Sequence, residues 1–301
     1  MHAPACSLKP PVGRSLTKKV AIVTDTTACI PPEQVSKYDI EIVSVPLQID
    51  QKTYRDGIDI TPAEFYAMLR EAKKAPTSSA SAPEPYLEAF QNASLKAESV
   101  ICLTEPSRFS AMYASARTAL QTAKSSLGNV TIEVVECTTA AAGQGLVALA
   151  AARAAALDKP FAEVKAITTT VMNKVKLYAT LNTLEYLARS GRVPQAAHMV
   201  NSILSIKPVF TLNHQGARTV ALARTMKNAI GRIVKFMETT VTKDQRLHVA
   251  VMHADDTADA AALKENIVAR FQCQELYITE FTPVMGVHTG PGLIGVAFYA
   301  E

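Results

Sequence analysis

Hydrophobic residues in the first half of the chain gather in short continuous runs, and longer segments of helical character lie between them. Three of the runs predict buried strands, at 19–25, 99–105 and 130–136. Three segments predict helices, at 60–74, 110–128 and 143–160. Strands that alternate with helices of this length predict a parallel sheet built from βαβ units.

Local sequence signals predict where one of these helices begins and where a further strand can lie. Thr61 is a good helix cap, Pro62 suits the first helical position, and Glu64 completes a capping box. The run at 40–49 predicts another strand, which Pro46 limits to a sheet edge or a strand end.

The pattern changes after Pro160. Strands are predicted at 176–182, 205–212, 217–223, 247–253 and 292–300, with helices near 225–241 and 257–270 and a hairpin turn at 213–216. We therefore expect a tail over 1–17, an α/β domain with a parallel sheet over 18–160, and a smaller mixed-sheet α/β domain over 161–301.

Composition excludes several classes of function. The chain has 301 residues, 48% of them hydrophobic, and a mild net charge of +4. Its basic residues are scattered and it has no Trp, which argues against nucleic-acid binding. Five widely spaced cysteines form no CxxC pair, so neither a disulfide framework nor a zinc site is predicted.

The beginning of the chain lacks the apolar core of a signal peptide. The alanine-rich segment 140–157 is interrupted by Gln144 and Arg153, which favours a packed helix over a membrane span. These features predict a cytosolic protein.

Hydroxyl side chains cluster in two places. The first is the loop PTSSASAP, at 76–83; it reads either as an ordinary surface loop or as a binding loop. The second is PSRFS, at 106–110, before a helix, where serine serves either as a cap or as part of an anion site. The loops that contain Asp25 and Thr139 also follow predicted strands, where a doubly wound fold places its ligands.

The segment FTPVMGVHTGPGLIGVAFYA, at 281–300, breaks an apolar stretch with His288 and a Gly-Pro-Gly turn. A hairpin needs only the turn, so the histidine is either structural or part of a site. His253 to Asp256 could suggest a metal, but a helix N-cap explains these residues more simply. No phosphate-binding loop of the G-x-x-x-x-G-K-[ST] type and no G-x-S-x-G elbow occurs in the sequence.

Nine motifs, in order, resemble those of the DegV family of bacterial fatty-acid-binding proteins, and they cover the chain from about residue 19 to its end. They are VAIVTDTTACIP, VPLQI, YRDGIDITPAEFY, PTSSAS, SRFSAMYASA, GQG, LEYLARSGRV, LSIKPVF and GVHTGPG. The resemblance implies an α/β protein of two domains, a three-layer α/β/α domain with a parallel sheet and a two-layer mixed-sheet domain, with a ligand tunnel between them.

The resemblance also implies a function. A long-chain fatty acid would lie in the tunnel, and the protein would present its carboxylate to a separate ATP-dependent fatty acid kinase that forms an acyl phosphate. The chain would then be a carrier subunit without catalytic residues, cofactor or metal.

The resemblance also assigns the family's ligand-binding positions to particular residues of this chain. Thr77, Ser110 and His288 would bind the carboxylate, with Ser78, Ser107 and Thr289 beside them. Arg192 and Arg224 match family arginines; Arg224 could face the kinase or form an ion pair between domains.

The chain departs from the family pattern at three places: Ala111-Met112 replaces Gly-Thr, Ser79-Ala80 replaces Gln-Pro, and Glu136-Cys137 replaces Asp-Ser. A different function remains open, that of a serine-dependent lipid esterase or acyl transferase that uses the same hydroxyls with His288 as base.

Overall fold

The computed structural model describes residues 18–72, 74–193, 206–213, 215–242 and 244–301. The expected tail at 1–17 and His214 of the expected hairpin turn lie outside these residues.

A parallel sheet forms the first half, as the alternating pattern predicts. Its strand order is β2-β1-β6-β7, and all neighbours are parallel. The strands are β1 (Lys18–Asp25), β2 (Glu41–Val43), β6 (Ala97–Thr104) and β7 (Thr131–Glu136). Helices α3 (Pro83–Lys96) and α4 (Met112–Ser126) cover one face, and α5 (Ala142–Ala156) covers the other. Short α1 (Pro32–Tyr38) packs against α5.

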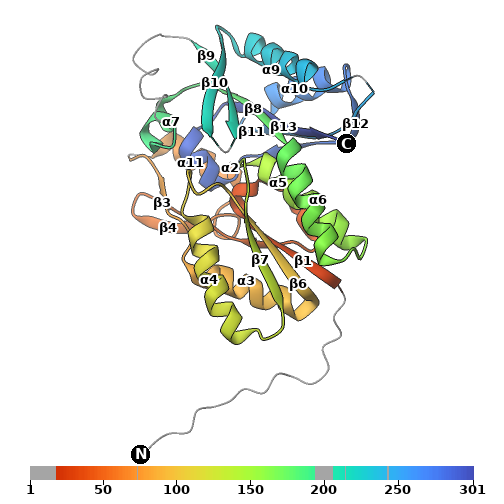
Figure 1. The fold of residues 1–301 in the computed structure, drawn as a ribbon. Helices are drawn as coiled ribbons and strands as arrows, with labels where there is room; N and C mark the ends of the chain where they lie inside the picture. Colours follow the sequence, from red (N-terminus) through yellow and green to blue (C-terminus); the bar gives the residue numbers. More distant parts are fainter. Residues whose placement is uncertain (1–17, 73, 194–205, 214, 243) are drawn as a thin grey trace, which may run out of the picture.

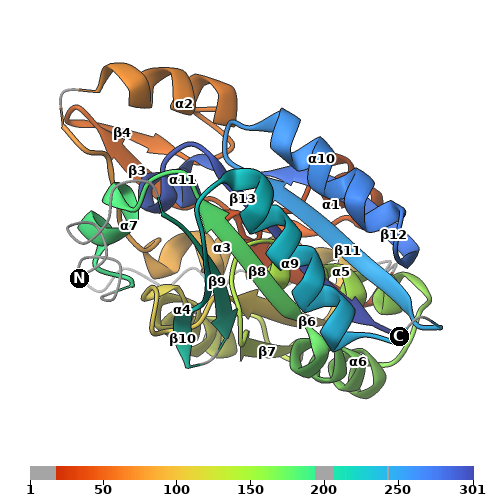
Figure 2. The same cartoon turned by 90° about the horizontal axis from the view of Figure 1, so that it is seen from above.

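A mixed sheet forms the second half, in the order β10-β9-β8-β13-β11-β12. Its strands are β8 (Lys176–Leu181), β9 (Lys207–Asn213), β10 (Gly216–Ala223), β11 (Arg246–His253), β12 (Gln272–Glu280) and β13 (Leu293–Ala300). Figure 2 shows α9 (Met226–Thr240) and α10 (Thr257–Val268) side by side across its outer face. The predicted α/β class with one parallel and one mixed sheet is confirmed, and with six strands the mixed sheet is the wider of the two.

Helix α5 lies between the two sheets (Figure 1), where it contacts β1 on one side and β11 and β13 on the other. Nearly all of its residues are buried, which explains its composition: small side chains allow two sheets to approach one helix. At Gly145 a Cβ would lie 2.5 Å from the Ala28 carbonyl oxygen in the short 3-10 helix η1 (Thr26–Ala28). Helix α6 (Phe161–Lys174) packs beside α5.

Arg153, the one charged residue of α5, joins the two halves. Its guanidinium pairs with the Glu275 carboxylate on β12, and Glu275 also accepts a hydrogen bond from His248 Nδ1 at 2.8 Å. One apolar cluster includes buried residues from both sheets and α5. Because the core is continuous across residue 160, the domain limits 18–160 and 161–301 stay a prediction.

A small third sheet, in the order β4-β3-β5, stands at the side of the molecule. It contains β3 (Pro46–Ile49), β4 (Lys52–Arg55) and β5 (Thr77–Ser78). The expected single strand at 40–49 is thus two strands in different sheets, because the chain leaves the parallel sheet before Pro46. Helix α2 (Pro62–Glu71) begins as predicted, with Thr61 and Glu64 forming a capping box.

The segment that carries His288 is helix α11 (Pro283–Thr289), which is followed by Gly290 and by β13, so it is not the arm of a hairpin. The helix has Pro283 in its first turn, and the buried Asp56 carboxylate accepts from the Val284 backbone N–H at 3.2 Å. A carboxylate at a helix N-terminus stabilises it, so the YRDGID motif supports the segment that carries His288.

Candidate functional site

A cavity of about 140 Å³ opens where the ends of the two large sheets, α11 and the segment after α7 (Glu185–Ser190) meet. One water needs only on the order of 10–15 Å³ on a comparable measure, so the cavity is far larger than a packing defect. Its walls are mostly apolar and come from strands of the mixed sheet and from neighbouring segments: Leu177, Ala179, Leu181, Phe210, Leu212, Ala217, Met252, Phe281 and Leu293.

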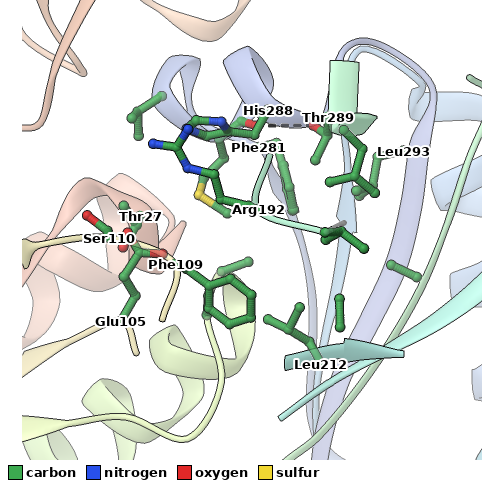
Figure 3. Close-up of a pocket in the computed structure, with 18 of the residues that line it drawn as sticks. Thr27, Glu105, Phe109, Ser110, Arg192, Leu212, Phe281, His288, Thr289 and Leu293 are labelled. Carbon is green, nitrogen blue, oxygen red and sulfur yellow. Dashed lines mark hydrogen bonds between the residues drawn. The ribbon is translucent and has the colours of Figure 1, made fainter. Parts of the chain in front are cut away.

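Polar side chains gather at one end of this cavity, where Figure 3 labels Thr27, Glu105, Ser110, Arg192 and His288. The lining also includes the polar residues Ser78, Ser79 and Thr289. Most of them come from loops or strand ends that are far apart in the chain, and the fold brings them together around an otherwise apolar cavity.

His288 lies in the last turn of α11 and is hydrogen-bonded through Nε2 to the Ser78 hydroxyl at 2.7 Å. Burial, with a smaller effect of the Arg192 charge, lowers the pKa of His288 to about 4, so the imidazole is neutral near pH 7. Among the described groups, its Nδ1 is a buried atom without a hydrogen-bond partner.

The pair has one free hydrogen in either tautomer. If Nε2–H donates to Ser78, the Ser78 hydroxyl is free to donate; if Ser78 donates to Nε2, the free donor is Nδ1–H. A neutral Ser–His pair of this kind therefore always keeps one hydrogen that it does not use itself, and in the first tautomer that hydrogen is on Ser78, which lines the cavity.

Thr77 and Ser78 point different ways, because side chains alternate along β5. Ser78 lines the cavity, whereas Thr77 is exposed and lines a second hollow of about 230 Å³. This hollow adjoins the cavity, since Ser78, Arg192 and His288 line both. Tyr186 and Arg189 form part of its wall.

Ser110 and Ser107 have different surroundings although both precede α4. Ser110 lines the cavity, and its hydroxyl oxygen accepts from the Met112 backbone N–H at 3.3 Å. Ser107 is exposed, and its hydroxyl and backbone N–H both donate to Glu136 at 2.6 Å. Glu136, one of the departures from the family pattern, thus holds Ser107 outside the cavity.

Thr289 lines the cavity but donates from its hydroxyl to the Met285 carbonyl oxygen at 3.1 Å, within its own helix. Arg192 lies at the junction of the cavity and the second hollow. Arg224 is exposed at the end of β10, just before α9, and is among the lining residues of neither space.

Sequence reasoning missed Glu105 as a site residue. The residue is 7% exposed and lines the cavity beside Ser110 (Figure 3). Burial raises the pKa of Glu105 to about 8, aided by the Asp25 charge and opposed by a hydrogen bond with Ser110. The available signal was its place directly after a buried strand, inside a hydroxyl-rich loop.

A buried polar network lies beside the polar end of the cavity. Asp25 accepts from the Thr27 backbone N–H and from the Tyr86 hydroxyl, both at 3.0 Å, and burial raises its pKa. Gln144 of the GQG motif donates to Thr24 at 3.0 Å and is 3.2 Å from the Thr27 hydroxyl oxygen. The network fixes Thr27, which lines the cavity.

Asp256 is the N-cap of α10 and accepts from the Asp259 backbone N–H, which confirms the capping interpretation of 253–256. Within the described ranges there is no group of three His, Cys, Asp or Glu residues placed to hold a metal ion. The same ranges contain no helix that is both long enough and apolar enough to cross a bilayer.

Fold and cavity together define an α/β protein with an apolar pocket closed by polar donors. The model of the DegV family matches residues 19–301, and the chain belongs to this family. A DegV domain-containing protein of Caldanaerobacter subterraneus is 30% identical over 289 residues, covering 93% of this chain and 99% of that protein. The protein DegV of Bacillus subtilis is 26% identical over 284 residues, covering 93% and 98% of the two chains.

Solved structures agree with this assignment. A DegV family protein from Thermus thermophilus, described as binding a fatty acid, has a TM-score of 0.86 at 26% identity and covers 94% of this chain and 100% of its own. The B. subtilis DegV structure, described as a fatty acid binding protein, has a TM-score of 0.83 at 25% identity, with coverage of 94% and 100%.

Proposed function

We propose that this protein binds a long-chain fatty acid, with its chain in the apolar cavity and its carboxylate at the polar end. The observation that carries the proposal is the neutral Ser78–His288 pair, with an unpartnered buried ring nitrogen, at the end of an apolar space. Fatty-acid binding by relatives of the same fold supports it.

The two parts of the ligand make different demands. Each methylene group removed from water contributes about 0.8 kcal/mol, so affinity comes chiefly from the chain. The carboxylate needs hydrogen bonds, because burying it unpaired costs several kcal/mol. Ser78, Ser110 and His288 supply neutral donors, and Thr77 lies on the side of β5 that faces the second hollow.

We further propose that the protein is a cytosolic carrier that presents the carboxylate to a separate ATP-dependent fatty acid kinase. Neutral donors satisfy the acid group while leaving an oxygen available to a phosphoryl donor. An arginine clamp would hold it more strongly, and Arg192, the arginine that lines the cavity, is exposed at its junction with the second hollow. The second hollow, which adjoins Ser78 and His288, gives a route from outside to that oxygen. In this proposal the chain needs no cofactor or metal of its own.

Single substitutions at the polar end test the binding site. We expect Ser110→Ala and His288→Ala each to weaken binding of a long-chain fatty acid by about tenfold or more, because hydrogen bonds to charged groups contribute about 1.5–3 kcal/mol. Native mass spectrometry of the purified proteins and titration of delipidated protein measure the effect. Ser107→Ala, outside the cavity, is the matched control and should bind as the parent does. Undiminished binding by both cavity variants would overturn the assignment.

The esterase or acyl-transferase alternative also rests on one observation, since the hydroxyl within reach of His288 is that of Ser78. Two features oppose it. Among the described residues no carboxylate is hydrogen-bonded to His288 Nδ1, where it could stabilise an imidazolium. Burial also keeps the pKa of His288 at about 4, far below the value that suits a general base near pH 7. Ester hydrolysis that is abolished by Ser78→Ala would favour the alternative instead.

The kinase partnership has its own test. If Arg192 and Arg224 dock the kinase, Arg192→Glu and Arg224→Glu should slow acyl-phosphate formation by about tenfold or more, because reversed charges repel an acidic partner surface. Arg224→Glu should leave lipid content unchanged, since Arg224 lies outside the cavity. Lys235→Glu, also on the second half, is the charge-matched control. Unchanged turnover in both arginine variants would remove them from the docking surface.

A further inference from the structure

Glu105 carries the one carboxyl group among the described residues that line the cavity. It follows β6 directly, and its side chain reaches toward Ser110 and Thr27 (Figure 3). Only 7% of the residue is exposed. A second carboxyl at the place proposed for a fatty acid's own carboxylate calls for an explanation, because two ionised carboxylates in one apolar cavity repel each other strongly.

We propose that Glu105 acts as a neutral carboxylic acid that donates a hydrogen bond to the ligand's carboxylate, so that fatty-acid binding requires one proton to be held at this position. The inference rests on the proposed function and adds to it a further ligand-contacting residue. It also implies that the affinity for a fatty acid depends on pH more strongly than the affinity for a ligand with an uncharged head group.

The hydrogen count at Ser110 favours a neutral Glu105. The Ser110 hydroxyl has one hydrogen, and its oxygen already accepts from the Met112 backbone N–H. If Glu105 is ionised, that hydrogen bonds to Glu105 and is lost to the ligand. If Glu105 is protonated, its own O–H becomes a further donor and the Ser110 hydrogen is free for the ligand.

The surroundings of Glu105 favour its neutral form on balance. Asp25, at the end of β1, and burial both oppose ionisation; Arg192, after α7, favours it but is exposed. His288 on α11 adds no charge near pH 7, because its pKa is lowered. Burial is the largest effect, and the pKa of Glu105 is raised to about 8 before any ligand enters. A bound carboxylate adds a further negative charge, and by reciprocity it raises the pKa of Glu105 again.

The linkage has a definite sign. Between about pH 6 and about pH 7.5 Glu105 holds its proton in both the free and the bound protein, so affinity for the acid is nearly constant. Above about pH 8 the free protein loses the proton and must regain it to bind, so the dissociation constant rises by up to about tenfold per pH unit. An uncharged ligand of the same chain length, which can be bound with Glu105 in either state, should show a weaker dependence.

The test uses dodecanoate and dodecanol as probes below their aggregation concentrations, with delipidated full-length protein, from about pH 6 to about pH 9.5. For the parent protein we expect the dodecanoate dissociation constant to rise about tenfold or more between about pH 8 and about pH 9.5. Glu105→Gln, which keeps the shape and the donor without the charge, should bind dodecanoate with little change over this range. Glu136→Gln, at the neighbouring strand end and outside the cavity, should keep the parent's dependence.

A second measurement needs no variant. Calorimetry at about pH 8.7, in buffers of different ionisation enthalpy, should show the parent taking up a large fraction of one proton per dodecanoate bound and much less per dodecanol. Tight dodecanoate binding without proton uptake, or the same pH dependence in Glu105→Gln as in the parent, would overturn the role of Glu105 while leaving the proposed function standing. Failure of the parent to bind either probe at any pH would overturn both.

Discussion

Replacing Ala217 with phenylalanine is expected to weaken fatty-acid binding by about a hundredfold or more while the protein remains folded. Ala217 lies on β10 and lines the cavity, paired across the β9–β10 hairpin with Leu212, which lines it too. A phenyl ring there would occupy space that the ligand's chain needs. Losing the burial of about four methylene groups costs about 3 kcal/mol, which corresponds to a factor of more than a hundred.

The position is suited to this test because it lies on an edge hairpin and is partly exposed, so the backbone has room to adjust. Ala261→Phe, on the exposed side of α10, introduces the same ring far from the cavity and should bind normally. Thermal unfolding of both variants provides the check on folding, and titration with a long-chain fatty acid gives the affinity. Parent-like binding by a folded Ala217→Phe protein would mean that the chain lies elsewhere.

Much of the fold could be predicted because local chemistry and burial agree there. The strands β1 and β6 contain continuous apolar runs, and a sheet covered on both faces accommodates such runs. The helix at α2 begins at its capping box, and α9 and α10 fall within one or two residues of their predicted limits. In these segments no long-range contact overrides the local preference.

Other elements could not be predicted because their surroundings decide them. Strand β12 is a sheet edge with mostly half-buried side chains, so it lacks the apolar run that marks β11. Residues 283–289 are rich in β-branched and small side chains, yet they form α11, where Asp56 supports the N-terminus and Gly286 packs against Phe65 and Tyr66. The local sequence shows the valines and the turn, but the Asp56 carboxylate that supports the helix lies more than two hundred residues earlier in the chain.

The candidate site, too, could be predicted from the sequence only in part. Ser110 and His288, expected from the family resemblance, do line one cavity, and Ser78 joins His288 by a direct hydrogen bond. Strand alternation turns Thr77 outward, which a loop sequence without a known register does not indicate. Glu105 could not be predicted as a site residue for another reason. A glutamate after a strand is ordinarily solvated, and it is the packing of other segments around Glu105 that buries its carboxyl group.

Gly290→Ala is expected to destabilise the protein by about 2–6 kcal/mol and to weaken fatty-acid binding. Gly290 ends α11 with φ +66° and ψ −175°, a backbone region that is essentially restricted to glycine and costs other residues about 1–3 kcal/mol. An added Cβ would also lie 2.2 Å from Cδ2 of the Tyr186 ring. Crowding of this kind in a packed region costs typically about 1–3 kcal/mol more.

Because His288 is two residues before Gly290, and Tyr186 is part of the wall of the second hollow, the strain falls on the binding site itself. Gly191→Ala is the matched control: Gly191 also ends a helix with a positive φ, +68°, but at ψ 0° and with no atom within 4 Å of an added Cβ. It should cost about 1 kcal/mol and leave binding nearly intact. Denaturant unfolding and dodecanoate titration of the two variants measure these effects. Equal losses of stability would show that the Tyr186 contact and the unusual ψ contribute nothing, and that the turn after α11 does not hold His288 in place.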